Sequence, residues 1–182
     1  MNINIFIIII RNNSIKNNYI MSDLLQRMPL QFEPKRKNRF VVRFPSDIGI
    51  SEWMVSSASR PSIKQGSTEI SFLNTSTYVL GRYTWDTIQV TFRDPIAPSA
   101  SQALMEWVRL CSESVTGRQG YAAGYKRDVE LEILDPSGVV IEKWILKNAW
   151  ISDCNFGTLA YNDDGIQEVT ATLVIDYAIL CY

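Results

Sequence analysis

The segment EVTATLVIDY, residues 168–177, alternates apolar and polar side chains along most of its length. Its apolar members are Val169, Ala171, Leu173, Ile175 and Tyr177. Its polar members are Glu168, Thr170, Thr172 and Asp176. Because side chains alternate between the two faces of a β-strand, we expect the apolar set to point inward and the polar set outward. A strand with one wet face is typical of an antiparallel sheet.

The same period of two recurs before this segment. It predicts strands over Arg39–Phe44, Thr84–Asp94, Asp128–Leu134 and Val139–Lys147. The last two flank Asp135-Pro136-Ser137-Gly138, in which Pro at the second position and Gly at the fourth suit a type I turn. We therefore expect a hairpin there, and a further turn at Asn162–Gly165. The chain is predicted to be mainly β.

One segment has helical spacing instead. In PSASQALMEWVRLCSES, residues 98–114, the apolar positions recur at the spacing of one helix face: Ala100, Leu104, Trp107, Val108 and Cys111. Ser99 and Gln102 stand three apart in the order of a capping box at the helix start. We expect a single amphipathic helix against one sheet, with Cys111 as a core residue rather than a nucleophile.

Ser56–Tyr83 is rich in Ser and Thr and contains the strand-like pieces Ile70–Leu73 and Thr77–Leu80. A structureless loop of this length is uncommon unless it has a function. The segment is therefore predicted to be an extended β-hairpin arm. Thr116–Lys126 is expected to be irregular, and its glycines do not follow the order of a dinucleotide-binding loop.

Composition limits the possible functions. The 182 residues are 46% apolar and 20% charged, which fits one globular domain. With 18 basic and 19 acidic side chains, the net charge of −1 does not favour nucleic-acid binding over the whole surface. The absence of histidine excludes Ser-His-Asp and Cys-His nucleophiles and HExxH zinc sites. The three cysteines form no CxxC pair, which favours a reducing compartment.

The N-terminal segment MNINIFIIII RNNSIKNNYI differs from the rest. Its apolar run is too short to span a bilayer, and we expect no membrane anchoring. We interpret residues 1–37 as a disordered or mis-called extension with a basic lead, and residues 38–182 as a single β domain. Residues 1–39 carry seven basic and two acidic side chains, and the remainder carries 11 basic and 17 acidic. The cluster Lys35-Arg36-Lys37 is interpreted as a solvated lead-in.

No arrangement of residues meets the requirements of catalysis. Asp128, Glu130 and Glu132 share one strand face, and three carboxylates in a row indicate a solvated acidic stripe rather than a glycosidase pair. Asp163-Asp164 suits turn chemistry before Gly165. We predict that the chain is not an enzyme and that it uses no cofactor or metal.

The order of elements resembles the tail tube proteins of contractile-tailed bacteriophages, which are related to type VI secretion tube proteins. The likeness extends over about residues 38–178. It rests on the first strand (38–42), the arm and following strand (58–61, 70–73 and 79–92) and the last strand (164–177). The sequence departs from the family in its basic lead and in Ala178–Tyr182, which runs past the usual last strand. These departures leave open a tube-like baseplate or tube-initiator component, or a secretion-tube protein.

The resemblance implies an antiparallel β-sandwich or small barrel with one flanking α-helix, α+β by strict count. It implies hexameric rings stacked into a tube inside a contractile sheath, with DNA passing through the channel. The implied partners are further copies of the chain and the sheath, baseplate and terminator proteins. Tape-measure protein and genomic DNA are expected transiently in the channel. The implied location is the virion tail, assembled in the host cytoplasm. A carbohydrate-binding β-sandwich is the alternative of another class.

Two sets of residues are candidate functional positions. We expect the arm to make contacts between subunits or rings through Arg60, Lys64, Phe72, Tyr78 and Arg82. DNA must pass a tube wall without being held, so a neutral or acidic face suits a channel. The candidate channel-facing residues are Asp128, Glu130 and Glu132 on one strand and Glu168, Thr170 and Thr172 on another.

Overall fold

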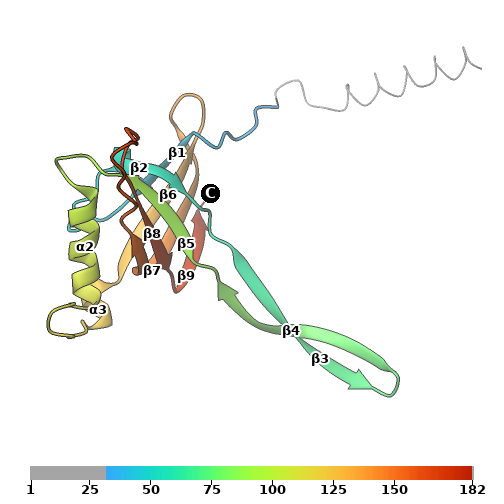
Figure 1. Cartoon of the computed structure of the whole chain (residues 1–182). Coiled ribbons are helices and arrows are strands. Elements are labelled where there is room, and N and C mark those ends of the chain that lie inside the picture. The colour runs from blue at the N-terminus through green and yellow to red at the C-terminus, as the bar shows by residue number, and fades with distance from the viewer. Residues whose placement is uncertain (1–31, 182) are drawn as a thin grey trace, which may run out of the picture. The chain divides into compact units, whose positions relative to one another are not determined.

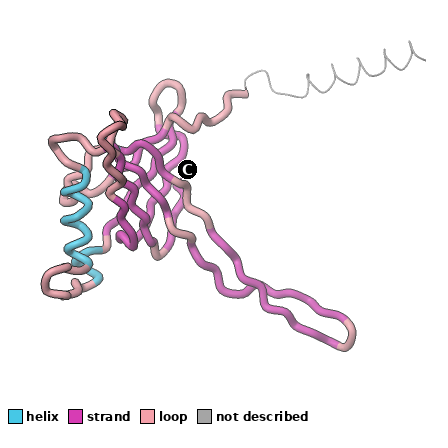
Figure 2. Tube along the Cα trace, in the orientation of Figure 1, coloured by secondary structure: helices cyan, strands magenta, loops and turns pink. Residues whose placement is uncertain are grey.

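The computed structural model describes residues 32–181 (Figures 1 and 2). It divides the chain into two compact units, Met1–Arg36 and Lys37–Tyr182, and the strands and helices below belong to the second unit. The prediction that residues 1–37 form an extension falls largely on residues 1–31, which lie outside the described residues. It stays a prediction.

Seven antiparallel strands form one sheet that bends around its longest strand, β7 (Val140–Asn155). The other six are β1 (Phe40–Arg43), β2 (Val55–Ala58), β5 (Ile88–Arg93), β6 (Arg127–Leu134), β8 (Glu168–Val174) and β9 (Tyr177–Cys181). Their order is β1-β6-β7-β8-β5-β2, with β9 also paired to β7. The predicted mainly β class with antiparallel strands is confirmed. Among the described strands the sheet stays open, because its end strands β1 and β2 do not pair with each other.

The bend in β7 divides the sheet into two layers. Residues 143–147 of β7 pair with β9 on one edge, and the same half of the strand pairs with β6 on the other. Residues 150–155 pair with β8 instead. Asn148 lies between the two halves with a φ of 56°, a left-handed conformation that Asn tolerates better than most residues. We call β1, β6, β9 and the first half of β7 the first layer, and β2, β5, β8 and the second half the second layer.

The core lies on the inner faces of these strands, as the period of two predicted. Val42 of β1 is buried, and so are alternate residues of the longer strands: Ile88, Val90 and Phe92 of β5, Val129 and Leu131 of β6, and Val169, Ala171 and Leu173 of β8. Phe40 and Phe44 pack against this core. The inward faces predicted for these strands are confirmed.

The prediction that Tyr177 continues the last inward face is wrong. β8 ends at Val174, and Tyr177 is 43% exposed and begins β9. The corner between the two strands is held by Asp176, whose carboxylate accepts hydrogen bonds from Lys126 Nζ and Asn148 Nδ2, both at 2.8 Å. Because β7 bends at Asn148, the chain must turn here to pair with the first half of β7. The C-terminal residues 178–181 are therefore part of the sheet.

The hairpin predicted between β6 and β7 is confirmed. Asp135 Oδ1 accepts hydrogen bonds from the backbone N–H of Ser137 at 2.8 Å and of Val139 at 2.9 Å. Gly138 has a φ of 87°, which glycine adopts at no steric cost. The turn chemistry of the sequence thus fixes the pairing of the two strands.

Helix α2 (Ala100–Cys111) forms where the helical spacing predicted it. Ser99 Oγ accepts a hydrogen bond from Gln102 N at 3.3 Å, so the serine caps the helix as expected. Ala100, Leu104 and Trp107 are buried. The short helices η1 (Glu52–Met54) and α3 (Ala122–Tyr125) complete the fold, and α3 lies in a segment predicted to be irregular.

Candidate functional site

The arm is a two-stranded hairpin that leads away from the sheet (Figures 1 and 2). It consists of β3 (Ile63–Phe72) and β4 (Thr75–Trp85), and it prolongs the pairing of β2 with β5. Every residue of β3 is exposed. The exposed large apolar side chains of the arm are Ile63, Ile70, Phe72, Leu73, Tyr78, Val79, Leu80 and Tyr83. The predicted extended hairpin is confirmed as a structure. So much exposed apolar surface on one element is typical of an interaction site.

Two of the five predicted arm residues hold the root of the arm. The guanidinium of Arg60 donates a hydrogen bond to Glu142 Oε1, and Trp144 Nε1 donates to the same oxygen at 2.6 Å. Lys64 Nζ lies 2.7 Å from Asp86 Oδ1, and this hydrogen bond lowers the pKa of Asp86. Arg60 and Lys64 therefore position the arm within the subunit, while their predicted contacts with other subunits remain a prediction.

We predict that Arg60→Ala lowers the free energy of unfolding by about 1–2 kcal/mol, because it removes a charged hydrogen bond from a buried carboxylate. The Glu142 side chain is only 8% exposed. Arg82→Ala is the matched control, since it removes an exposed arginine from the same hairpin. Its expected effect is below about 0.5 kcal/mol. Urea unfolding measures both, and equal losses would show that the Arg60 contact does not stabilise the subunit.

The other three predicted arm residues face solvent. Phe72 is 73% and Tyr78 is 66% exposed, and Arg82 is exposed as well. Between root and tip the two strands approach closely at Gly66 and Gly81, where a Cβ on Gly66 would lie 2.8 Å from the backbone oxygen of Arg82. The register of the pair shifts at this point. The part of the arm beyond Gly66 and Gly81 is exposed, and none of its residues belongs to the core.

The outer face of the first layer carries three predicted channel residues, but it is not a bare acidic stripe. Lys147 Nζ lies 2.6 Å from Asp128 Oδ2, and Lys143 Nζ lies 2.7 Å from Glu130 Oε2. Glu132 is buried, with Lys143 at 3.5 Å and Arg43 at 3.3 Å from its oxygens. The interpretation as a solvated stripe is wrong, because β7 and β1 place cations opposite these carboxylates. The lysine hydrogen bond lowers the pKa of Asp128.

The outer face of the second layer carries the other three predicted channel residues and fewer charges than the first layer. Thr170 and Thr172 are half-buried on β8, opposite Thr91 and Gln89 of β5. Glu168 is exposed at the start of the strand, where its Oε1 accepts a hydrogen bond from Ser56 Oγ at 3.0 Å. Arg93 lies opposite Glu168 and Asp153 lies opposite Thr172, so this face combines hydroxyl and amide groups with three charged side chains. The structure places the six channel candidates on two different faces, three on each.

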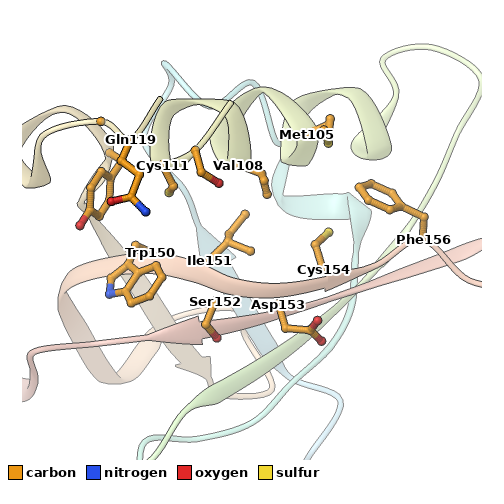
Figure 3. Close-up of a pocket in the computed structure, with 13 residues that line it drawn as sticks. Met105, Val108, Cys111, Gln119, Trp150, Ile151, Ser152, Asp153, Cys154 and Phe156 are labelled. Carbon is orange, nitrogen blue, oxygen red and sulfur yellow. The ribbon is translucent and has the colours of Figure 1, made fainter. Parts of the chain in front are cut away.

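A pocket of about 470 Å³ lies between α2 and the second half of β7 (Figure 3). Its lining combines polar side chains, among them Ser112, Gln119, Ser152 and Asp153, with apolar ones. The apolar ones include Met105, Val108, Cys111, Ile151, Cys154 and Phe156. Burial raises the pKa of Cys111 and raises that of Cys154 to about 11, so both thiols are protonated at neutral pH. Residues 32–181 contain no group of three or more acidic or cysteine side chains placed to hold a metal ion. No local pattern in the sequence indicates this pocket.

The strand edges are a further feature of the surface. Within the described residues β1 pairs only with β6, β2 only with β5, and β9 only with β7. Unpaired edges accept strands from other chains unless something covers them. No helix of the described chain is both long and apolar enough to cross a membrane. The described chain is thus defined, as a class, by an open antiparallel sheet with a projecting hairpin arm.

The comparisons with known proteins give this class a particular fold. No family model matches the sequence, and no curated protein matches it. The chain is similar in structure to a chain of the anti-feeding prophage cap, the tube-terminating cap, with a TM-score of 0.67 and 17% identity over 85% of this chain and 94% of the other. It is similar to a chain of the sheath/tube terminator of PVC, an extracellular contractile injection system, with a TM-score of 0.65 and 16% identity over 84% and 99%. A chain of the PVC sheath–tube complex gives a TM-score of 0.66 and 16% identity over 84% and 93%.

These likenesses extend over nearly the whole length of both chains in each pair. They confirm, at the level of the fold, the resemblance to tube proteins of contractile systems that the sequence indicated. Two of the three similar chains come from a cap or a terminator, and the third comes from a sheath–tube complex.

Proposed function

We propose that this chain is a structural subunit of the tube of a contractile particle, in which hexameric rings stack around a channel inside a sheath. The observation that carries the proposal is the fold shared over 84–85% of the chain with components of contractile injection systems. The exposed arm and the unpaired strand edges support the proposal, because in a ring of copies a neighbouring chain contacts the arm and pairs with an edge. In a phage tail this channel is the path of DNA, and the subunit belongs to the virion.

The proposal also states which partners the subunit contacts and that it catalyses no reaction. The subunit contacts further copies of itself, the sheath, and the baseplate or terminator at the tube ends. Tape-measure protein and DNA occupy the channel transiently. The protonated thiols of Cys111 and Cys154 support a role without catalysis, since a thiol nucleophile acts as its thiolate.

A second candidate function is the terminator of the tube. The likenesses to the anti-feeding prophage cap and to the PVC sheath/tube terminator favour it. A terminator forms one ring that ends the stack, whereas a main tube subunit stacks ring upon ring. Both functions use the same arm and edges within a ring, so they differ in how many rings assemble.

The test of the proposed function is electron microscopy of the purified protein in negative stain. We expect tubes of uniform diameter from a main tube subunit. Uniform single rings would support the terminator instead. Monodisperse monomers at concentrations of tens of micromolar and above would contradict both functions and favour a carbohydrate-binding module or another monomeric role.

We predict that the outer face of β8, which carries fewer charges than the first layer, lines the channel. A wall that carries Lys and Arg would hold phosphates, and the first layer carries Lys143, Lys147 and Arg43 beside its carboxylates. The strands of the second layer carry a single basic side chain, Arg93, which lies opposite Glu168. The double variant Thr170→Lys/Thr172→Lys is therefore expected to form tubes but to slow DNA ejection, with the largest effect at low salt. Thr170→Gln/Thr172→Gln is the matched uncharged control.

A variant on the outer face of the first layer tests the opposite assignment of the channel. Asp128→Lys adds a cation to the exposed end of the first layer without changing the buried Glu132. If that variant slows ejection and the β8 variant does not, the first layer faces the channel and the prediction for β8 is wrong. The measurement in both cases is the rate of DNA release from assembled particles at two salt concentrations.

A further inference from the structure

The tip of the arm presents two large apolar side chains to solvent. Phe72 is 73% exposed and Leu73 is 88% exposed, and Thr75 Oγ1 donates a hydrogen bond to the Phe72 carbonyl at 3.0 Å across the turn. The turn consists of only two residues, Leu73 and Asn74, because Phe72 pairs with Thr75. The apolar pair is thus held at the end of an ordered hairpin.

Leu73 stands where the backbone does not favour leucine. Its φ is 52°, in the left-handed region that bulky residues seldom adopt. Positions with positive φ in two-residue hairpin turns usually hold Gly, Asn or Asp. Glycine would meet the needs of the turn without steric cost. A strained backbone position of this kind points to a role for the side chain itself.

The pocket under α2 contains apolar side chains of the kind that the tip would contact, beside polar ones. Figure 3 shows Ile151 and Cys154 of β7 directed toward the helix, and Val108 and Cys111 of α2 directed toward the strand. Asp153 lies on the other side of the β7 backbone from α2 (Figure 3). A pocket of about 470 Å³ has room for two side chains, and its apolar members would contact Phe72 and Leu73.

The two features lie on opposite sides of the unit that carries both. Figure 1 shows α2 on one side of the sheet and the arm leading away on the other. The tip of one chain therefore does not reach its own pocket. An arm tip on one side and a pocket on the other join one copy to the next, head to tail. Head-to-tail contacts of this kind close into rings or extend into filaments. A ten-residue strand spans roughly 33 Å, which is far enough to reach across a neighbouring domain.

We propose that the arm tip of one subunit inserts Phe72 and Leu73 into the pocket between α2 and β7 of a neighbouring copy of the same chain. This contact rests on the proposed assembly of copies and names the two surfaces that meet in it. Apolar burial drives the insertion, and the rigid two-residue turn limits the entropy lost on ordering the tip.

The native thiols of the pocket allow a direct test by disulfide cross-linking. The variant Leu73→Cys/Cys181→Ser carries a thiol at the tip and keeps Cys111 and Cys154 in the pocket. Under copper–phenanthroline oxidation at pH 9, we expect a ladder of disulfide-linked oligomers, since the proposed contact brings the tip within disulfide reach of the pocket. Mass spectrometry should find the introduced thiol joined to Cys111 or Cys154.

Two control variants make the test specific. Adding Cys111→Ser/Cys154→Ser is expected to remove the ladder. Moving the introduced thiol to Gln65, an exposed residue near the arm root, should leave it unlinked to the pocket. Introduced thiols that link only to one another would overturn the proposal.

Electron microscopy of the same samples separates this proposal from the proposed function. Tubes or rings without a link to Cys111 or Cys154 would overturn the tip contact and leave the tube function standing. A link without rings or tubes would support the contact and contradict the tube function. The absence of both would overturn both.

The variant Leu73→Gly provides a second measurement that does not depend on oxidation. Because glycine suits the left-handed turn, the isolated subunit should unfold at the same or a higher urea concentration. Assembly should nevertheless require at least tenfold more protein, since the apolar side chain is gone. Unchanged assembly in Leu73→Gly would overturn the role of Leu73.

Discussion

Removing Ser67–Leu80 from the arm is expected to abolish assembly while leaving the subunit folded. All of the removed residues are exposed, and none belongs to the core cluster. The deletion joins Gly66 to Gly81, and Gly66-Gly81-Arg82 then forms a three-residue hairpin loop that contains two glycines. Gln65 and Tyr83 keep their pairing, as do Lys64 and Thr84. The root of the arm should therefore survive.

The expected loss of assembly is complete because the deletion removes the tip and most of the exposed apolar residues of the arm together. Negative-stain electron microscopy and sedimentation measure the loss. Circular dichroism and urea unfolding serve as the folding control, with an expected change in the free energy of unfolding below about 1 kcal/mol. Tubes of normal diameter from the shortened chain would show that the arm is not an assembly element.

The prediction of most strands from the sequence succeeded because burial on one face alone sets a period of two. Val169, Ala171 and Leu173 repeat at the positions that the core requires, and they are buried. The hairpin at Asp135–Gly138 succeeded for a different reason. Its turn residues make their hydrogen bonds locally, so neighbouring residues are sufficient to specify it.

The corner between β8 and β9 could not be predicted in this way. The inward positions stay apolar through Ile175 to Tyr177, and no Gly or Pro marks the turn. What turns the chain is the bend of β7 at Asn148 and the contacts of Asp176 with Lys126 and Asn148. These partners are distant in sequence, so a local pattern carries no signal of them.

The candidate site shows the same division. The arm was predicted as a hairpin from its length and its strand-like pieces, and the structure confirms that. The cations beside Asp128, Glu130 and Glu132 were missed because they depend on the register of β6 with β7, which places Lys143 opposite Glu132. The pocket under α2 was missed for a similar reason, since it joins residues from a helix and a distant strand.

Replacing Trp107 by alanine is expected to lower the free energy of unfolding by about 3–5 kcal/mol, the largest effect of any single change considered for this chain. The side chain is 1% exposed and lies edge-on to Phe44, with ring centroids 6.3 Å apart. Its Nε1 donates a hydrogen bond to the Tyr125 carbonyl at 2.8 Å, which ties α3 to α2. Alanine would leave a cavity at the helix–sheet contact and an unpaired carbonyl oxygen.

Two further variants separate these contributions. Trp107→Phe keeps most of the apolar packing but not the hydrogen bond, so we expect a smaller loss of about 1–2 kcal/mol. Trp53→Ala removes a tryptophan that is 59% exposed, and its expected loss is below about 1 kcal/mol. Urea midpoints at an unchanged slope measure all three. Since α2 covers one side of the pocket, a loss below about 1 kcal/mol for Trp107→Ala would mean that the helix is not anchored through this residue. The pocket would then lack the rigid wall that the docking of an arm tip requires.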